Sequence, residues 1–155
     1  MLDDFGIPLT IAGPGGAGYS RWYADTVAAE AKGHKVKIMG EVSETVKRHL
    51  LQDAPALLYA INYPEGTSEA HSMKMVNAML CGTPCVTERV GAMPEVIDDG
   101  LTGRYADGDW GAALARAAVM DRRVVREQAV ARWSVQSAVE RLLPWYDAVA
   151  EGHRW

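Results

Sequence analysis

The stretch that decides the fold reads EAHSMKMVNAMLCGTPCV and spans residues 69–86. Its apolar residues recur at helical spacing as far as Gly82, and the short apolar run TPCVTE (83–88) follows directly. This periodicity, ended by a glycine, predicts a helix over 68–82, and the run after it predicts a strand. The apolar residues interpreted as core filler of this helix are Met73, Met75, Met79 and Leu80.

The same alternation of helix and strand extends to both sides of this stretch. Strands are predicted at 7–13, 34–40, 55–62 and 103–106, and helices at 19–33, 43–53 and 93–100. The strands are nearly all apolar, so both faces of their sheet are expected to be covered. The predicted fold class is therefore α/β: a three-layer, Rossmann-like parallel sheet of about five strands with helices on both faces.

The C-terminal third of the chain is predicted to be helical. Residues suited to cap helix N-termini are Ser43, Asp109, Asp121 and Ser134. Pro144 is expected to kink the last helix or to restart it. With no repeat or linker in its 155 residues, the chain is predicted to form a single domain over 1–155.

Composition excludes several classes of function. Hydrophobic residues make up 48% of the chain and charged residues 23%, with a formal net charge of -4, which argues against a nucleic-acid-binding surface. The basic residues Arg122, Arg123 and Arg126 are interpreted as a solvated helix face, because Asp121 and Glu127 lie among them. No apolar run approaches the ~20 residues of a membrane-spanning helix.

The cysteines and histidines give no metal or disulfide pattern. Cys81 and Cys85 lie four residues apart and are interpreted as buried free thiols, which together with an acidic, short N-terminus favours a reducing cytoplasm. The four histidines are scattered and have no ligand spacing, so no metal site is predicted.

Four glycine-containing loops, 13–19, 40–43, 62–72 and 88–94, are candidates for binding a ligand, because ligands of such sheets lie at the carboxyl ends of strands. In the first of them, GPGGAG (13–18), Gly13, Gly15 and Gly18 fit GxGxxG, and Glu41 follows the next strand. Three interpretations stay open for this loop: a dinucleotide site, a phosphate cradle, or a flexible turn stiffened by Pro14.

The loop 62–72 leads into the helix predicted at 68–82. Free N–H groups and the dipole at a helix N-terminus favour an anion, and Ser72 and His71 could approach a phosphate or a sugar. Glu69 suits sugar hydroxyls, or the positive charge that develops at a sugar carbon during transfer. It could equally be a first-turn acid that only stabilises the helix dipole.

Residues 68–105, SEAHSMKMVNAMLCGTPCVTERVGAMPEVIDDGLTGRY, resemble the signature of retaining GT-B glycosyltransferases of family four. The matching motifs are NAMLCGTP, GAMPEVIDDG and LTG, in order and spacing. The resemblance runs from about residue 7 to 149. It implies a C-terminal, donor-binding domain for a nucleotide sugar carrying UDP, GDP or ADP, with no metal ion and no further cofactor.

The resemblance also implies roles for individual residues. The loop Gly40, Glu41, Val42 and Ser43 would receive the base, and Gly15 belongs to the glycine-rich loop. Glu69 would lie by the transferred sugar, as an electrostatic and positioning residue. His71, Ser72 and Met73 would meet phosphates or sugar at the helix start, and Asn77 would stand at the ribose hydroxyls.

This chain departs from the family pattern at that helix. Asn77 stands where the family has a ribose-binding Glu, and an amide offers one acceptor oxygen where a carboxylate offers two. The expected loss in donor binding is about 1–2 kcal/mol, roughly tenfold. His71 and Ser72 replace the usual Phe-Gly, so His71 either contacts the ligand or packs in the place of the aromatic ring.

The largest departure is at the N-terminus. Residue 7 corresponds to the family's second strand, so the first strand, its phosphate-binding Arg and Lys, and the acceptor domain have no counterpart here. Without that strand the order becomes 2-1-3-4-5, which predicts a closed five-stranded sheet. The alternative is a homodimer or a partner chain that fills the gap.

Two functions follow from these observations. The first is the donor half of a retaining glycosyltransferase, with little or no activity as an isolated chain. The second is a non-catalytic nucleotide-sugar-binding or interaction module derived from such an enzyme, which the Asn77 replacement favours. Trp133, Trp145 and Trp155 in the tail are expected to be more exposed than in the family, or used for self-association.

Overall fold

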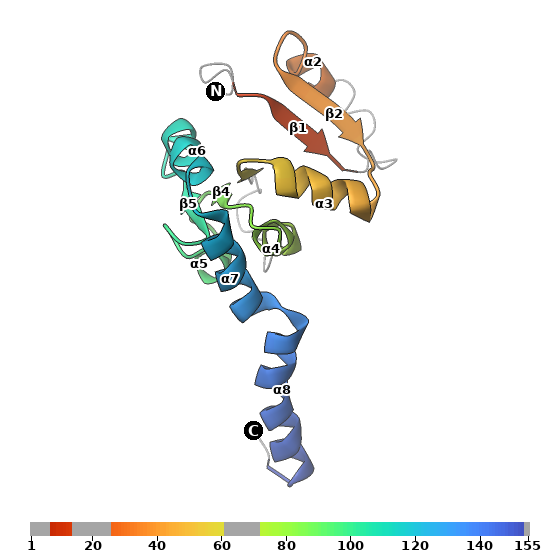
Figure 1. The fold of residues 1–155 in the computed structure, drawn as a ribbon, viewed down its shortest axis with the longest axis vertical. Helices are drawn as coiled ribbons and strands as arrows, with labels where there is room; N and C mark the ends of the chain where they lie inside the picture. Colours follow the sequence, from red (N-terminus) through yellow and green to blue (C-terminus); the bar gives the residue numbers. More distant parts are fainter. Residues whose placement is uncertain (1–6, 14–25, 61–71, 154–155) are drawn as a thin grey trace. The chain divides into compact units, whose positions relative to one another are not determined.

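A computed structural model describes residues 7–13, 26–60 and 72–153 (Figure 1). The chain divides into two compact units, residues 1–50 and 51–155, and each is described by itself. The elements are β1 (Leu9–Ala12), α2 (Ala28–Glu30), β2 (Val36–Gly40), α3 (Glu44–Asp53), β3 (Leu57–Tyr59), α4 (Met73–Leu80), β4 (Cys85–Thr87), α5 (Met93–Val96), β5 (Gly103–Tyr105), α6 (Trp110–Ala118), α7 (Arg122–Trp133) and α8 (Val135–Ala150).

The first unit contains a parallel pair of strands. β1 pairs with β2 from Leu9 opposite Val36 to Ile11 opposite Ile38, and the register then shifts so that Ala12 lies opposite Gly40. The predicted strands 7–13 and 34–40 are thereby confirmed. Only part of the helix predicted at 19–33 lies among the described residues, and there α2 is helical.

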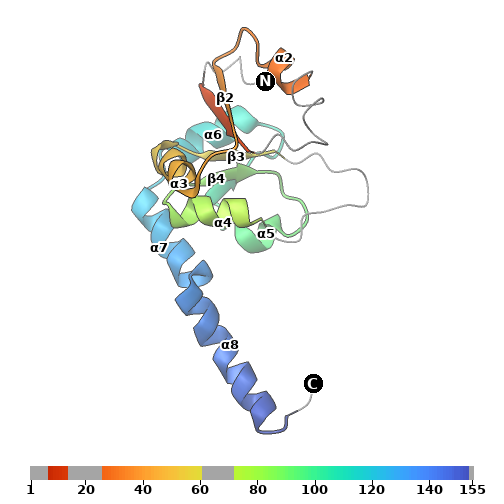
Figure 2. The same ribbon diagram turned by 90° about the vertical axis from the view of Figure 1, so that its right-hand side faces the viewer.

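The second unit contains three parallel strands in the order β3-β4-β5. Alternate residues of each strand face opposite sides. Leu57, Tyr59, Cys85 and Tyr105 pack with α4, α5 and α7, whereas Leu58 and Val86 pack against α6. Figure 2 shows α4 and α6 on opposite sides of β3 and β4. The expected three-layer arrangement with helices on both faces is confirmed.

The five parallel strands form two sheets, not one. Each neighbour pair of the predicted order 2-1-3-4-5 is present except the pair β1 and β3, which belong to separate sheets and separate units. The closed five-stranded sheet was therefore a wrong prediction for the described residues, because no ladder of hydrogen bonds joins the two strands there. The alternative with a dimer or a partner chain stays a prediction.

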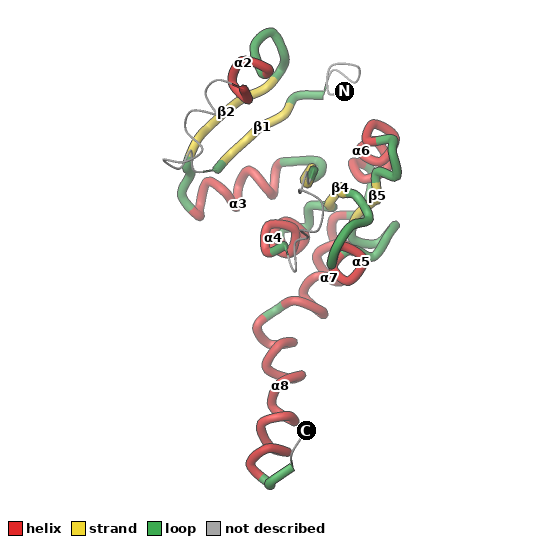
Figure 3. Tube along the Cα trace, turned by 180° about the vertical axis from the view of Figure 1, so that it is seen from behind, coloured by secondary structure: helices red, strands yellow, loops and turns green. Residues whose placement is uncertain are grey.

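Local sequence signals set the helix ends. The carboxylates of Asp109 and Asp121 accept from Ala112 N–H and Arg123 N–H at 2.9 Å each, and Ser134 Oγ accepts from Ser137 N–H at 3.1 Å. These predicted caps, and the Ser43 cap on Val46 N–H at 3.3 Å, are confirmed. α8 continues through Pro144 as a single helix, so of the two predicted alternatives the restart is excluded (Figure 3).

Gly82 and Gly103 are required by the backbone around them. Gly82 follows the last turn of α4 with φ +80, and a Cβ there would lie 2.9 Å from the Arg122 carbonyl oxygen. A Cβ on Gly103 would lie 2.2 Å from the Cys85 carbonyl oxygen, so only glycine allows β5 to pair with β4 at this point.

Arginines of α7 bind the C-terminal ends of three other helices. Arg122 donates to the carbonyls of Leu51, Gln52 and Ala54 at the end of α3, Arg126 to Leu80 at the end of α4, and Arg132 to Glu95 in α5. The solvated-face interpretation was wrong for Arg122, which is half-buried and binds carbonyls that have no partner within their own helix. Arg126 is exposed, as predicted, although it also binds a carbonyl. The interpretation is right for Arg123, which is 79% exposed beside Asp121 and Glu127.

Candidate functional site at the carboxyl ends of β3, β4 and β5

The three strands of the second unit end in one row of side chains. Tyr59, Thr87 and Tyr105 are register partners, and each is the last residue of its strand. Tyr59 and Tyr105 both pack with the core on the α4 and α5 side of the sheet. Thr87, two residues after Cys85 on β4, shares that side by alternation. The row therefore marks the carboxyl edge of the sheet, where α/β proteins bind ligands.

The N-terminus of α4 lies at the same edge. α4 connects two parallel strands, β3 and β4, so it runs back along the sheet and its first turn lies where the strands end. The Cys85 thiol of β4 lies 3.6 Å from the Met75 carbonyl oxygen in the first turns of α4, so this part of the helix packs directly on the strand. Met75 and Met79 are buried in the core beneath it, as predicted.

The first turn of α4 has donors that could receive an anion. Ser72 precedes the helix, and its carbonyl accepts from the N–H groups of Met75 and Val76 at 3.1 and 3.2 Å. The Ser72 side chain makes no capping hydrogen bond to the helix, and the first turn contains no acidic residue. The N–H groups at such a turn lack partners within the helix, and the dipole adds positive potential. A phosphate oxygen bound here would accept hydrogen bonds from these N–H groups, and its negative charge would be stabilised by the positive potential.

Two buried hydroxyls at this edge lack a hydrogen-bond partner. Ser72 Oγ and Thr87 Oγ1 are each in residues 0% exposed, and among the described residues neither oxygen is bonded. An unpaired buried hydroxyl costs about 1–3 kcal/mol, so nearly all such groups in proteins have a protein or water partner. Sequence reasoning found Ser72 and missed Thr87, for which the only signal is a hydroxyl residue that closes an apolar strand.

The remaining predicted residues of α4 differ in exposure. Met73, the first residue of α4, is 59% exposed, so its assignment as core filler was wrong. Asn77 is half-buried one turn further along. Its proposed place at a ribose stays a prediction.

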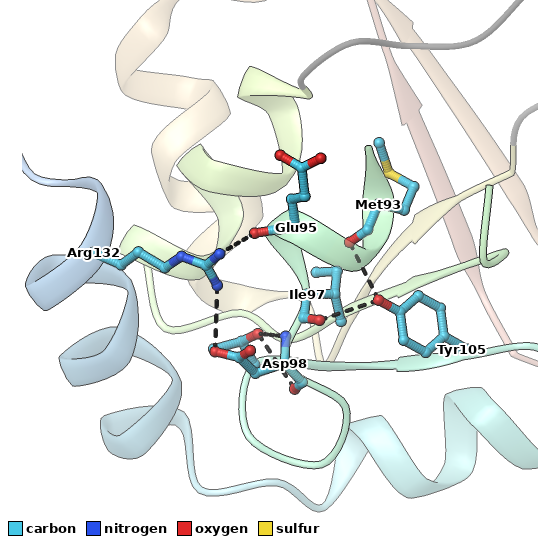
Figure 4. A network of polar contacts seen from close by, with 7 residues as sticks. Met93, Glu95, Ile97, Asp98, Tyr105 and Arg132 are labelled. Carbon is cyan, nitrogen blue, oxygen red and sulfur yellow. Dashed lines mark hydrogen bonds and ion pairs between the residues drawn. The ribbon is translucent and has the colours of Figure 1, made fainter. Parts of the chain in front are cut away.

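The loop after β4 is held to the end of β5 by Tyr105. The Tyr105 hydroxyl lies 3.2 Å from the Met93 carbonyl oxygen and 3.1 Å from that of Ile97, at the two ends of α5 (Figure 4). Burial raises the pKa of Tyr105, and the nearby Arg89 charge opposes that rise. The phenol therefore stays a hydrogen-bond donor at neutral pH and positions the GAMPEV motif beside the edge row.

Arg132 fixes the other side of α5. In Figure 4 its guanidinium reaches the Glu95 carbonyl and the Asp98 carboxylate, with 3.5 Å between Arg132 Nη1 and Asp98 Oδ2. The Thr102 hydroxyl accepts from Asp98 N–H at 2.9 Å and closes the turn that leads into β5. The residues 93–105 thus form a cross-braced segment at the rim of the candidate site.

Two cations stand beside the edge row, and neither was predicted. Lys74 Nζ lies 5.5 Å from the centre of the Tyr59 ring, and Arg89 Cζ lies 3.9 Å from the centre of the Tyr105 ring. Both side chains belong to exposed residues. A lysine in the first turn of a helix opposes the dipole, which is the signal that could have drawn attention to Lys74.

The other predicted site residues belong to the first unit or lie outside the described residues. Gly40 ends β2 with φ +68, Glu41 and Ser43 are exposed, and Val42 is half-buried, all in the first unit. The sites predicted at Gly15, Glu69 and His71 lie outside the described residues. Their assignments stay predictions.

Nothing in the described ranges forms a metal cluster. No group of three His, Cys, Asp or Glu residues gathers within 7–13, 26–60 and 72–153. Cys81 and Cys85 are free thiols, and only Cys85 is fully buried. The helices described here include none that is long and apolar enough to cross a membrane.

Comparison with known proteins identifies the class. The family model "Glycosyl transferases group 1" matches residues 3–120, and the chain belongs to this family of GT-B type. Residues of the chain are 34% identical over 94 positions to a D-inositol 3-phosphate glycosyltransferase of Mycolicibacterium vanbaalenii, covering 56% of this chain and 21% of that protein. A D-inositol 3-phosphate glycosyltransferase of Corynebacterium jeikeium is 33% identical over 97 residues, covering 56% and 23%.

Solved structures agree on the fold. AviGT4, a glycosyltransferase involved in avilamycin A biosynthesis, superposes with a TM-score of 0.81 at 24% identity, covering 99% of this chain and 46% of AviGT4. Anabaena Alr3699/HepE in complex with UDP-glucose superposes with a TM-score of 0.64 at 16% identity, covering 91% and 41%. The chain thus matches about a fifth of the length of the curated relatives and less than half of these structures.

Proposed function

We propose that this chain binds a nucleotide sugar, with UDP, GDP or ADP as its nucleotide, as the donor domain of a retaining glycosyltransferase. The observation that carries the proposal is the buried, unpartnered Ser72 hydroxyl at the first turn of α4, beside the carboxyl edge of β3, β4 and β5. Such a turn receives the phosphates of a nucleotide. A UDP-glucose complex of a structural neighbour supports the ligand class.

The proposal assigns the remaining steps to residues by family resemblance. Glu69 would stabilise the charge that develops at the transferred sugar. Asn77 would bind the ribose hydroxyls more weakly than a carboxylate would. The base would be received by the loop of Gly40, Glu41, Val42 and Ser43. No metal ion and no further cofactor takes part, so donor binding is expected to be the same with EDTA as with Mg²⁺.

The decisive experiment is calorimetric titration of the purified chain with UDP-, GDP- and ADP-sugars. One donor should bind to the wild type, and Asn77→Glu should bind it about tenfold more tightly, because a carboxylate accepts from both ribose hydroxyls. Gln128→Glu, the same kind of change on an exposed position of α7, is the matched control and should leave the affinity unchanged. Absence of binding by every donor would refute the proposal.

Activity of the chain by itself is a separate part of the proposal. The catalytic cleft of a GT-B enzyme also needs an acceptor-binding domain or partner chain, so the isolated chain is expected to transfer little or no sugar. Product formation by the purified chain with donor and acceptor alcohols would contradict this. The two free thiols are those of a protein from a reducing compartment, and we propose the cytoplasm.

A non-catalytic binding or interaction module is the second candidate. The half-buried amide of Asn77 at a position where the resemblance expects a carboxylate favours it. Supplying a separately expressed acceptor domain discriminates the two. Restored transfer supports the enzyme, whereas donor binding without transfer in the reconstituted mixture supports the module.

A further inference from the structure

We infer that Lys74 and Arg89 supply the positive charge that holds the diphosphate of a bound nucleotide at the carboxyl edge of β3, β4 and β5. The inference deepens the proposed function and rests on it for the identity of the nucleotide. The ligand chemistry is that of a nucleoside diphosphate, whose two phosphates could contact one cation each.

The position of Lys74 is unfavourable without an anion. It is the second residue of α4, whose first turn contains no acidic side chain. The helix N-terminus already carries a partial positive charge, so a cation there destabilises the helix. When an anion binds at this turn, the electrostatic contribution of Lys74 becomes favourable, because both the helix dipole and the lysine attract the anion. The two buried, unpartnered hydroxyls of Ser72 and Thr87 at the same edge are independent evidence for a polar ligand.

Arg89 differs from the arginines around it. Arg104 pairs with Asp99 at 3.6 Å and Arg132 with Asp98 at 3.5 Å, whereas no carboxylate in the described part of the chain lies within ion-pair distance of Arg89. Its guanidinium rests on the Tyr105 ring, which holds the cation in place through its face and leaves the N–H groups at the edge of the guanidinium available.

The register of the sheet sets the spacing of the two cations. Tyr59 and Tyr105 flank Thr87 on adjacent strands, so their backbones are about 10 Å apart. Lys74 stands over the first ring and Arg89 over the second, with the buried Thr87 hydroxyl between. A diphosphate placed above Thr87 would have a cation on each side.

Two of the three acidic groups that raise the pKa of Tyr105 are ion-paired with arginines other than Arg89. Asp98 and Asp99 act on the Tyr105 phenol, but each is paired with its own arginine, Arg132 and Arg104. Asp107 also acts on the phenol.

The test is calorimetric titration of UDP, uridine and inorganic pyrophosphate into the wild type and into Lys74→Gln, Arg89→Gln and Arg123→Gln. Each site variant should bind UDP and pyrophosphate about tenfold more weakly, because one charge-assisted contact is lost, and uridine unchanged. Arg123→Gln removes one charge from an exposed arginine of α7 and should match the wild type. Ligand-free Lys74→Gln should melt slightly higher than the wild type, which shows that it is folded.

The outcomes separate this inference from the proposed function. If UDP binds and the two site variants match Arg123→Gln, the inference is wrong and the donor proposal stands. If pyrophosphate binding is weakened in the site variants but no nucleotide sugar binds, the inference stands and the donor proposal fails. If the wild type binds neither UDP nor pyrophosphate, the inference is overturned.

Discussion

The guanidinium of Arg122 donates a hydrogen bond to Oγ1 of Thr83 at 2.8 Å, and both residues also bind the Leu51 carbonyl. Arg122 further binds the carbonyls of Gln52 and Ala54. One side chain of α7 thus satisfies the end of α3 and the turn that precedes β4. Since β4 is the central strand of its sheet, this contact supports the elements that form the candidate site.

Arg122→Ala is expected to lower the free energy of unfolding by about 2 kcal/mol, because it removes the donor of the half-buried Ala54 carbonyl and one of the two donors to the Leu51 carbonyl. Urea denaturation followed by circular dichroism measures the change. Arg123→Ala, on the exposed side of the same helix, should change stability by less than about 0.5 kcal/mol. Equal stability of the two variants would show that the α3 carbonyls are satisfied without Arg122.

Tyr105→Phe should lower the free energy of unfolding by about 1 kcal/mol, because the bonds to the Met93 and Ile97 carbonyls are lost while the ring stays. The conservative exchange keeps the core volume, so a loss reports the hydroxyl alone. Tyr146→Phe on α8, where the residue is exposed, is the control and should have no effect. A neutral result for Tyr105→Phe would mean that water replaces the hydroxyl.

The chain should become less stable as the pH rises above about 9. Burial raises the pKa of the Cys85 thiol well above its ordinary value of 9.0. The unfolded chain therefore loses this proton first, while the folded chain keeps it. The contribution is fully present below pH 9, and the free energy of unfolding then falls by up to about 1.4 kcal/mol per pH unit.

Denaturation midpoints of the wild type and of Cys85→Val between pH 7 and 10 measure this contribution of Cys85. The valine variant keeps an apolar side chain in the core and has no proton to lose, so its stability should fall less steeply. Parallel curves for the two proteins would contradict the assignment.

The half-buried Cys81 should react with a thiol reagent in the folded protein, whereas Cys85 should react only on unfolding.

The apolar face of α8 should mediate association, as predicted for a homodimer or a partner chain. No residue of α8 is buried, and exposed apolar residues recur every three or four positions, at Val135, Val139, Leu142, Tyr146 and Val149. Light scattering at several concentrations should show a mass that rises with concentration. The double variant Leu142→Gln, Tyr146→Gln should abolish the rise, whereas Arg141→Gln should not. A strict monomer at every concentration would rule out self-association.

Much of the second unit could be predicted because its signals are local. The helix stop at Gly82 and the caps at Asp109, Asp121 and Ser134 depend on backbone geometry within three or four residues. The apolar strands likewise imply helices on both faces. In the candidate site, Ser72 was found because it lies in the polar loop that leads into a recognisable helix, although α4 begins at Met73, later than the predicted start at 68.

Other parts of the site depend on contacts that no local pattern contains. Thr87 belongs to the site because β3 and β5 place Tyr59 and Tyr105 on either side of it. Arg89 was missed because its partner ring lies on another strand. Met73 was assigned to the core because periodicity gives its helical face but not how far the core extends along the helix.

The sequence by itself determined the order of strands and helices, most of their ends and the family to which the chain belongs, because these follow from local propensity and from motif spacing. Only the tertiary structure decided that Arg122 binds carbonyls 68 to 71 positions away, and that the strands divide into two sheets. The reason is physical: hydrogen bonds between distant segments depend on which surfaces meet in space, and that choice is made by packing of the whole chain.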